Sequence, residues 1–329
     1  WAEARGRNRL FLDAARMETP AWLRLKMIDS DWVVSRLKGE GRPMILDGGM
    51  GTALERNGVP MDDRVWSGRA MLTHPDAVRS AHEAFIQAGA EAILTNTFST
   101  ARHMLEPGGL GSEVRKINSI AVDLAKQARE RVARSPVAIV GSICEWTSDS
   151  NPNWCSPEVV GQAAREQAEV LAESGVDILA LEMCERVELS EAVADAVIGL
   201  GLPVWIGVSA RTHQGHTKLA TASYADCSFE EIVKRISSYP VDIVNIMHTQ
   251  IPDIDRAFEI VRQYWSGPIG IYPESGFFTM PNWNFVDVIS PEDLVVEANT
   301  WVKNGVRLLG GCCGLGPDHI KALADMDCE

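Results

Sequence analysis

The sequence predicts an α/β protein that folds as a (β/α)₈ TIM-type barrel with an N-terminal extension. Eight short apolar runs recur between residues 43 and 313, and amphipathic helical stretches separate them. The runs are continuously apolar rather than alternating, which is typical of strands buried on both faces, as in a parallel sheet. Eight such alternations over about 285 residues match the size of a barrel of this type.

The elements follow one another in a regular order. The expected strands lie in PMILDGG (43–49), EAILTNT (91–97), PVAIVGS (136–142), VDILALE (176–182), PVWIGVS (203–209), VDIVNIM (241–247), GPIGIYP (267–273) and VRLLGGCC (306–313). The expected helices span 75–88, 112–134, 156–174, 187–199, 228–238, 252–265 and 290–304. Two of them begin with Ser-Pro-Glu, which places an N-cap serine before a proline at the first helical position. The alternative is a doubly wound open sheet, but no G-x-G-x-x-G turn follows the first run.

Composition restricts the classes of partner. The net charge of −14 argues against nucleic acid, and no apolar run approaches the roughly 18 residues of a membrane helix. Seven scattered cysteines and no apolar leader favour a reducing, cytoplasmic location. Residues 1–42 carry nine basic and six acidic residues, unlike the acidic remainder. We therefore expect an arm over 1–42, either a docking segment or a helix that covers the barrel floor, and a barrel over 43–329.

Polar residues stand where the expected strands end. They are Asp47, Asn96, Ser142, Glu182, Ser209, Asn245, Tyr272, Glu274, Cys312 and Cys313. Active sites of these barrels form at the carboxyl ends of the strands, so the side chains are expected to converge on one mouth. The alternative is that strand ends are polar only because they reach water. A disulfide between the adjacent cysteines is not expected, since neighbouring α-carbons lie about 3.8 Å apart and a bridge spans roughly 4.4–6.8 Å. The two adjacent cysteines could instead bind a metal, supply a reactive thiol or simply pack as small apolar residues.

Four motifs resemble the homocysteine S-methyltransferase family: DGGMGTALERNG, AGAEAILTNTF, YPESG and NGVRLLGGCCGLGPDHIKAL. This family includes betaine–homocysteine and S-methylmethionine–homocysteine methyltransferases and the homocysteine module of methionine synthase. The likeness runs from about residue 43 to 325. It implies a methyltransferase of methionine biosynthesis in which three cysteines hold zinc and zinc binds the thiol of homocysteine. The implied methyl donor is an onium compound, a folate or a cobalamin on a separate corrinoid protein.

The resemblance also assigns roles to individual residues. Two zinc cysteines fall on Cys312 and Cys313, but the third falls on Ile246, which cannot bind a metal. Asp47 and Glu182 resemble contacts to the ammonium group of the amino acid, and Asn245 precedes the missing cysteine. The remaining expected contacts to substrate are Gly48, Trp66, Asn96 and Glu274. Glu274 stands where the family usually has asparagine.

Three hypotheses about the altered site stay open. In the first, His248 replaces the missing thiolate, because period-two alternation would put residues 246 and 248 on one side and Met247 on the other. In the second, the enzyme works without metal. In the third, the chain is a zinc-free barrel subunit that binds a methylated ligand or a corrinoid partner without methylating homocysteine.

Two loops rich in aromatic residues, 144–155 and 275–285, are expected to overhang the mouth. Aromatic faces attract onium groups, which favours a betaine or a sulfonium compound as methyl donor. The expected partners are therefore a small thiol and a methyl donor, with a homo-oligomer as a further possibility.

Overall fold

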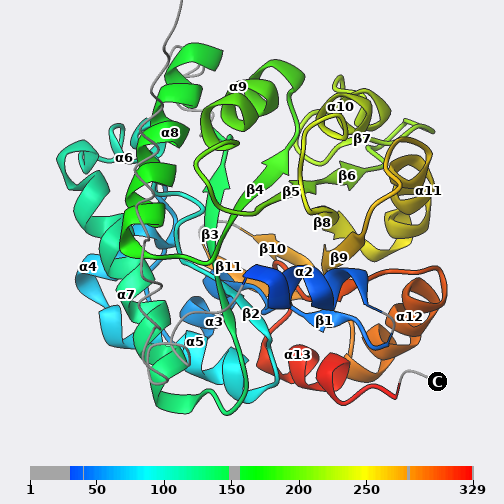
Figure 1. Ribbon diagram of the computed structural model, residues 1–329, viewed down its shortest axis with the longest axis horizontal. Coiled ribbons are helices and arrows are strands. Elements are labelled where there is room, and N and C mark those ends of the chain that lie inside the picture. Colours follow the sequence, from blue (N-terminus) through cyan, green and yellow to red (C-terminus); the bar gives the residue numbers. More distant parts are fainter. Residues whose placement is uncertain (1–29, 40, 148–155, 280–281, 328–329) are drawn as a thin grey trace, which may run out of the picture.

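A closed barrel of parallel strands forms the body of the molecule. The computed structural model describes residues 30–39, 41–147, 156–279 and 282–327. The strands of the main sheet follow the order β1-β12-β9-β8-β5-β4-β3-β2, and a parallel bridge between Leu46 and Ala92 joins β1 to β2. The sheet therefore closes on itself, with helices around it (Figure 1). The predicted fold class is confirmed.

Each predicted apolar run overlaps one barrel strand, and four of the strands extend one to three residues beyond the run. These strands are β1 (Met44–Ile45), β2 (Ala92–Leu94), β3 (Ala138–Cys144), β4 (Ile178–Cys184), β5 (Val204–Val208), β8 (Ile243–Gln250), β9 (Ile269–Glu274) and β12 (Leu308–Leu309). Two short hairpins, β6 (Ala210–Arg211) with β7 (Ala220–Thr221) and β10 (Phe277–Thr279) with β11 (Asn282–Val286), follow β5 and β9.

The helices around the barrel occupy the predicted stretches, with short additions. They are α3 (Met50–Arg56), α4 (Ala70–Thr73), α5 (Pro75–Gln87), α6 (Arg102–Leu105), α7 (Val114–Val132), α8 (Pro157–Ser174), α9 (Val187–Val197), α10 (Phe229–Ile236), α11 (Ile254–Tyr264), α12 (Pro291–Lys303) and α13 (Pro317–Ala324). The predicted N-caps form, since the hydroxyl of Ser156 accepts from the amide of Val159 and that of Ser290 accepts from Asp293.

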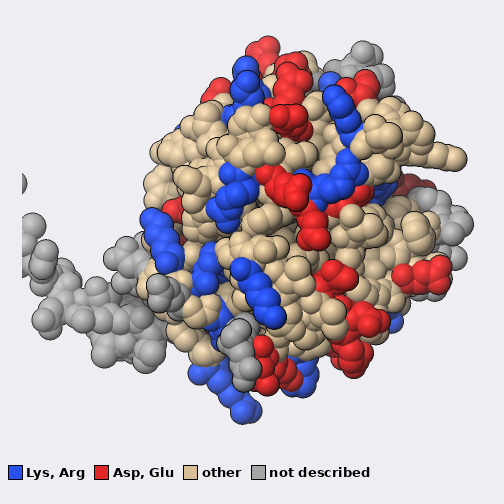
Figure 2. Space-filling view, turned by 90° about the vertical axis from the view of Figure 1, so that its right-hand side faces the viewer, with Lys and Arg blue, Asp and Glu red and all other residues tan. Residues whose placement is uncertain are grey.

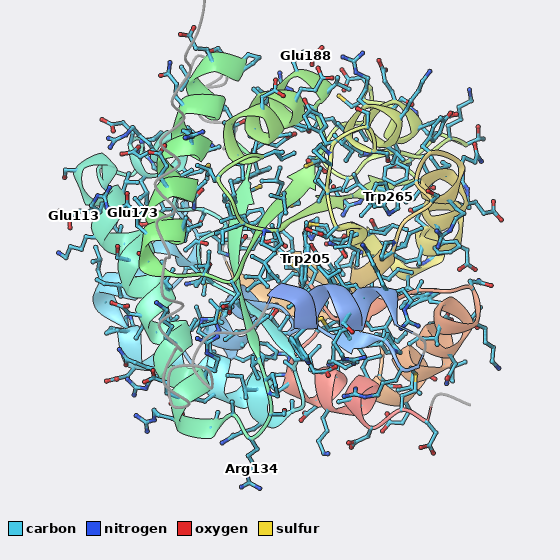
Figure 3. All side chains as sticks on the ribbon, viewed as in Figure 1. Glu113, Arg134, Glu173, Glu188, Trp205 and Trp265 are labelled. Atoms are coloured by element: carbon cyan, nitrogen blue, oxygen red, sulfur yellow. The ribbon has the colours of Figure 1, made fainter. Side chains whose placement is uncertain are left out.

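Strand side chains point alternately into the barrel and out toward the helices. The inner layer includes Met44, Ile178 and Trp205, and the outer layer includes Ile139 and Leu179. Trp205 is 1 % exposed and lies near the centre of the view in Figure 3. The barrel is therefore a filled core, and space for a ligand is left above this layer.

A helix covers the amino-terminal end of the barrel. Helix α2 (Ser30–Lys38) lies across the ring of strands in Figure 1. Its Val33 and Leu37 are buried in the same cluster as Met44 of the inner layer. Arg36 pairs with Glu91, which directly precedes β2. This part of the predicted arm thus closes the barrel floor, and the carboxyl ends of the strands remain for a site.

The described part of the chain contains no helix long and apolar enough to cross a bilayer. On the face that Figure 2 shows, acidic and basic side chains are interspersed rather than gathered into one basic stripe.

Candidate active site

A cavity of about 110 Å³ lies at the carboxyl ends of the strands. Its walls come from the loops after β1 and β2 and from the ends of β3, β4, β8, β9 and β12. Seven of the predicted site residues line it: Gly48, Trp66, Asn96, Glu182, His248, Cys312 and Cys313. The residues therefore converge as expected for a barrel of this type.

Two thiols and an imidazole form a compact group at one end of the cavity. The sulfur atoms of Cys312 and Cys313 are 4.0 Å apart, and Nδ1 of His248 is 3.5 Å from the sulfur of Cys312. All three ligand atoms lie within 4.8 Å of one another. Tetrahedral zinc with Zn–S near 2.3 Å and Zn–N near 2.05 Å would separate two sulfurs by about 3.8 Å and sulfur from nitrogen by about 3.5 Å. The donor set and its spacing therefore fit zinc.

A backbone irregularity in β8 turns His248 toward the cavity. In this strand Ile243 and Met247 belong to the inner layer, whereas Val244 and Ile246 belong to the outer layer. Plain alternation would put residue 248 outside, but the register of β8 against β9 shifts between Met247 and Gln250, and His248 adopts φ 44°. The sequence-based argument was wrong here, because it directed residue 246 inward and Met247 away. The backbone places them the other way round.

Glu274 contacts His248 at the same ring nitrogen that faces Cys312. Its Oε2 lies 3.0 Å from Nδ1 of His248. Its Oε1 accepts from Arg211 at 2.5 Å and from Gln250 at 3.2 Å. Burial alone would raise the pKa of Glu274, but the charges of His248 and Arg211 outweigh it and hold this pKa below its usual value. Glu274 thus sits as a buried carboxylate against the imidazole, not as a lining residue of the cavity.

The charges of the cluster depend on one another. Burial would lower the pKa of His248, but Glu274 and Cys312 raise it well above its ordinary value. The hydrogen bond with Cys313, together with burial, raises the pKa of Cys312. The carboxylate of Glu274 therefore favours the charged form of the imidazole, and the hydrogen bond with Cys313 and burial favour the neutral form of the Cys312 thiol.

Glu182 lines the cavity, and the predicted Asp47 lies buried near it without lining the cavity itself. Glu182 accepts hydrogen bonds from the hydroxyls of Ser142 and Tyr272, the latter at 3.1 Å. Asp47 accepts from the amide of Leu94 at 2.9 Å, and its Oδ1 has no hydrogen-bond partner among the described residues.

Burial raises the pKa of both Asp47 and Glu182, and the charge of Glu182 raises that of Asp47 further. An unpartnered buried oxygen beside a second carboxylate is costly, so this corner is suited to a cation with N–H donors.

The remaining predicted residues lie in different surroundings. Asn96 accepts from the hydroxyl of Ser67 at 2.7 Å, and Trp66 packs edge to face on Phe98 at 5.9 Å between ring centroids. A Cβ on Gly48 would lie 2.5 Å from the carbonyl oxygen of Leu315, so only glycine fits there.

Asn245 is not brought to the cavity. It lies two residues before Met247, fully buried beside Gly270, and neither amide atom has a partner among the described residues.

Sequence reasoning missed several residues of the site. Met183 and Met247 line the cavity, and the amide of Met183 donates to the sulfur of Met247. Tyr272 was noted only as a polar strand end, and Arg211 carried no signal because it lies beyond the fifth strand. Parts of the two aromatic loops, 148–155 and 280–281, lie outside the described residues. Phe277, which follows β9, is 64 % exposed and does not line the cavity.

Comparison with known proteins agrees with the motifs. The homocysteine S-methyltransferase family model matches residues 44–326. A selenocysteine methyltransferase of Astragalus bisulcatus is 26 % identical over 90 % of this chain and 96 % of its own length. The homocysteine S-methyltransferase YbgG of Bacillus subtilis is 28 % identical over 85 % of this chain and 93 % of its own. The metallated homocysteine methyltransferase MmuM of Escherichia coli shares the fold, with a TM-score of 0.71 at 23 % identity over 88 % of this chain and 97 % of that one.

Proposed function

The chain belongs to the homocysteine S-methyltransferase family and is an S-methyltransferase, and from this we propose an acceptor and a set of roles for its residues. The acceptor is an amino acid of the homocysteine type, with its thiol or selenol at Cys312, Cys313 and His248. Its ammonium group lies at Asp47 and Glu182. The observation that carries this proposal is a single cavity lined both by the sulfur–imidazole group and by the carboxylate of Glu182, whose charge acts on the neighbouring Asp47, a buried carboxylate with an unpartnered oxygen.

Zinc is the cofactor that the donor set fits, with Cys312, Cys313 and His248 as its ligands. When bound, it supplies deprotonation of the coordinated acceptor thiol, whose own pKa near 8.5 would leave it mostly protonated.

The chain's own side chains position the two substrates and provide the negative charge that binds the ammonium group. Ser142 and Tyr272 hold both oxygens of Glu182, so this carboxylate is fixed before the ammonium group arrives. Trp66 and Phe98 present aromatic surface to the cavity, which suits the positive group of an onium donor. In the transfer, a new bond forms between the acceptor sulfur and the methyl carbon. The bond from that carbon to the donor's sulfur or nitrogen breaks, and its electron pair stays on that atom, which becomes neutral. The proton of the acceptor thiol is released to water.

The test is methyl transfer to homocysteine from a panel of donors that includes a sulfonium amino acid and a betaine. Purified protein is expected to methylate homocysteine with at least one donor. Cys312→Ser is expected to lose more than about 100-fold in rate, since a metal ligand is removed. Cys227→Ser is the matched control, because Cys227 is a free cysteine that does not line the cavity. Full activity in Cys312→Ser, or no methylation of homocysteine with any donor, would contradict the proposal.

A further inference from the structure

We propose that Glu145 is a positioning residue for the acceptor site, and that it acts by fixing the end of β4, which carries Glu182 and Met183. This inference rests on the ammonium site of the proposed function. Glu145 is buried and is not among the residues that line the cavity. Its effect on the acceptor therefore passes through the backbone that follows Glu182.

The side chain of Glu145 reaches from the end of β3 to the end of β4. These two strands lie side by side (Figure 1) and pair in parallel as far as Glu182. Oε1 of Glu145 accepts from the amide of Glu185 at 2.9 Å and from that of Arg186 at 2.8 Å. Its Oε2 accepts from the hydroxyl of Ser190 in α9 at 2.5 Å. One carboxylate thus joins three elements at the mouth of the barrel.

Glu145 also replaces the cap that α9 lacks. This helix begins at Val187, and the side chain of its N-cap residue, Arg186, makes no capping hydrogen bond. Amides at the amino-terminal end of a helix have no partner within it, and a negative charge there is favourable to the helix dipole. Glu145 therefore fixes the point at which β4 ends and α9 begins.

The segment that joins Glu182 to these amides departs from regular strand geometry. Met183 adopts φ 52°, a left-handed value that is uncommon for residues other than glycine. The register of β4 against β5 shifts within the same segment. Glu182 and Met183 both line the cavity, so the irregular backbone forms part of its wall. Such a conformation persists only where its surroundings hold it, and Glu145 holds the end that lies beyond Met183.

The charge of Glu145 sets the strength of these hydrogen bonds. Burial raises its pKa to about 7 from 4.5, although the Ser190 hydroxyl and the two amides act in the opposite direction. The titratable groups that face it are Cys144 on its own strand, and Cys184 and Glu185 at the end of β4. Hydrogen bonds to an ionised acceptor are roughly twice as strong as those to a neutral one. The end of β4 is therefore held more firmly above pH 7 than below it.

The experiment measures the Kd of homocysteine by isothermal titration calorimetry, with Zn²⁺ present, between about pH 6 and 8.5. Glu145→Gln keeps an oxygen acceptor for the two amides but removes the charge. At about pH 8.5 it is expected to weaken homocysteine binding by about 5- to 10-fold, because the amide bonds lose their ionised acceptor. At about pH 6 the two Kd values should agree within about twofold, since Glu145 of the parent is then mostly protonated as well. Titrations that both proteins share, such as that of the acceptor thiol, cancel in the ratio.

Asp177→Asn is the matched control. Asp177 directly precedes β4, and its Oδ2 accepts from the amide of Ile139 in β3 at 2.7 Å and pairs with Arg129 at 2.9 Å. It therefore joins the same two strands at the end of the barrel away from the cavity. Its variant is expected to have a lower Tm and an unchanged Kd for homocysteine at every pH. Zn²⁺ affinity, measured by chelator competition, should be unchanged in Glu145→Gln, since the hydrogen bonds of Glu145 go to the end of β4 and to α9.

A ratio of Kd values that is constant across this pH range in folded Glu145→Gln would overturn the inference. So would an equal loss of homocysteine affinity in Asp177→Asn, or a parallel loss of Zn²⁺ affinity in Glu145→Gln. If Glu145→Gln does not fold, Glu145→Asp keeps the charge on a shorter side chain and is expected to weaken homocysteine binding, and a Kd equal to that of the parent would overturn the inference. A parent that binds homocysteine without methylating it rejects the transfer but not the role of Glu145. A parent that binds no homocysteine rejects both.

Discussion

A cysteine at position 246, where the family resemblance implies one, is predicted not to repair a metal site that lacks His248. Two variants test this: His248→Ala alone, and His248→Ala combined with Ile246→Cys. Ile246 is fully buried in the outer layer, between the barrel and the helices. A thiol at that position would face the same layer and could not reach Cys312 without a change in the backbone of β8.

The expected loss of affinity follows from the number of ligands. Structural zinc sites with four ligands have apparent binding free energies of about 10–16 kcal/mol, so one ligand contributes about 3–4 kcal/mol, or roughly 100- to 1,000-fold in Kd. His248→Ala is expected to lose this much. The added Ile246→Cys removes buried carbon atoms and is expected to lower the free energy of unfolding by about 1–2 kcal/mol without any gain in affinity.

Zinc affinity is measured by competition with a chromophoric chelator, and thermal unfolding is recorded for each variant. Ile246→Cys in the parent is the control for the packing loss alone. Zinc binding by the double variant within tenfold of the parent would refute the reasoning. Residue 246 would then face the cavity, and the backbone irregularity in β8 would not be what turns His248 toward it.

Three other predictions concern the parts of the molecule around the metal site. Tyr272→Phe removes one hydrogen bond to the carboxylate of Glu182 and is expected to lower kcat/KM by about tenfold, mainly through KM for the amino acid, a result that steady-state kinetics checks. Burial lowers the pKa of His82 to about 3 from 6.5. Between these two pH values the unfolded chain therefore binds a proton at His82 that the folded chain does not. Stability should therefore fall as pH drops below 6.5, by about 2 kcal/mol from His82 at pH 5. Urea unfolding at pH 7.5 and 5 should show this loss reduced in His82→Leu but not in the exposed control His216→Gln; equal losses in both would contradict it. Leu37→Ala opens a cavity at the barrel floor and is expected to cost about 2–5 kcal/mol of unfolding free energy, and an unchanged Tm would show that α2 does not close the barrel.

The strands were predictable because each lies in an apolar run. A strand that is buried on both faces needs no further pattern in its sequence to be recognised. The ends of those runs also predicted which polar residues would meet, and Glu182, Asn96 and Cys312 do line one cavity. Asn245 was misplaced for a physical reason. It lies inside the barrel, but one layer below the cavity. The residue type alone does not show how far a side chain lies from the carboxyl end of its strand.

The amino-acid order alone is enough to establish the barrel and the family, and it predicts that one zinc cysteine is missing, because these depend on short-range pattern and on motifs. Only the folded chain decides that His248 faces the two thiols and that Arg211 reaches Glu274. The direction of a side chain at a strand end depends on one backbone dihedral angle and on register against the neighbouring strand. Both are set by packing between segments far apart in the chain.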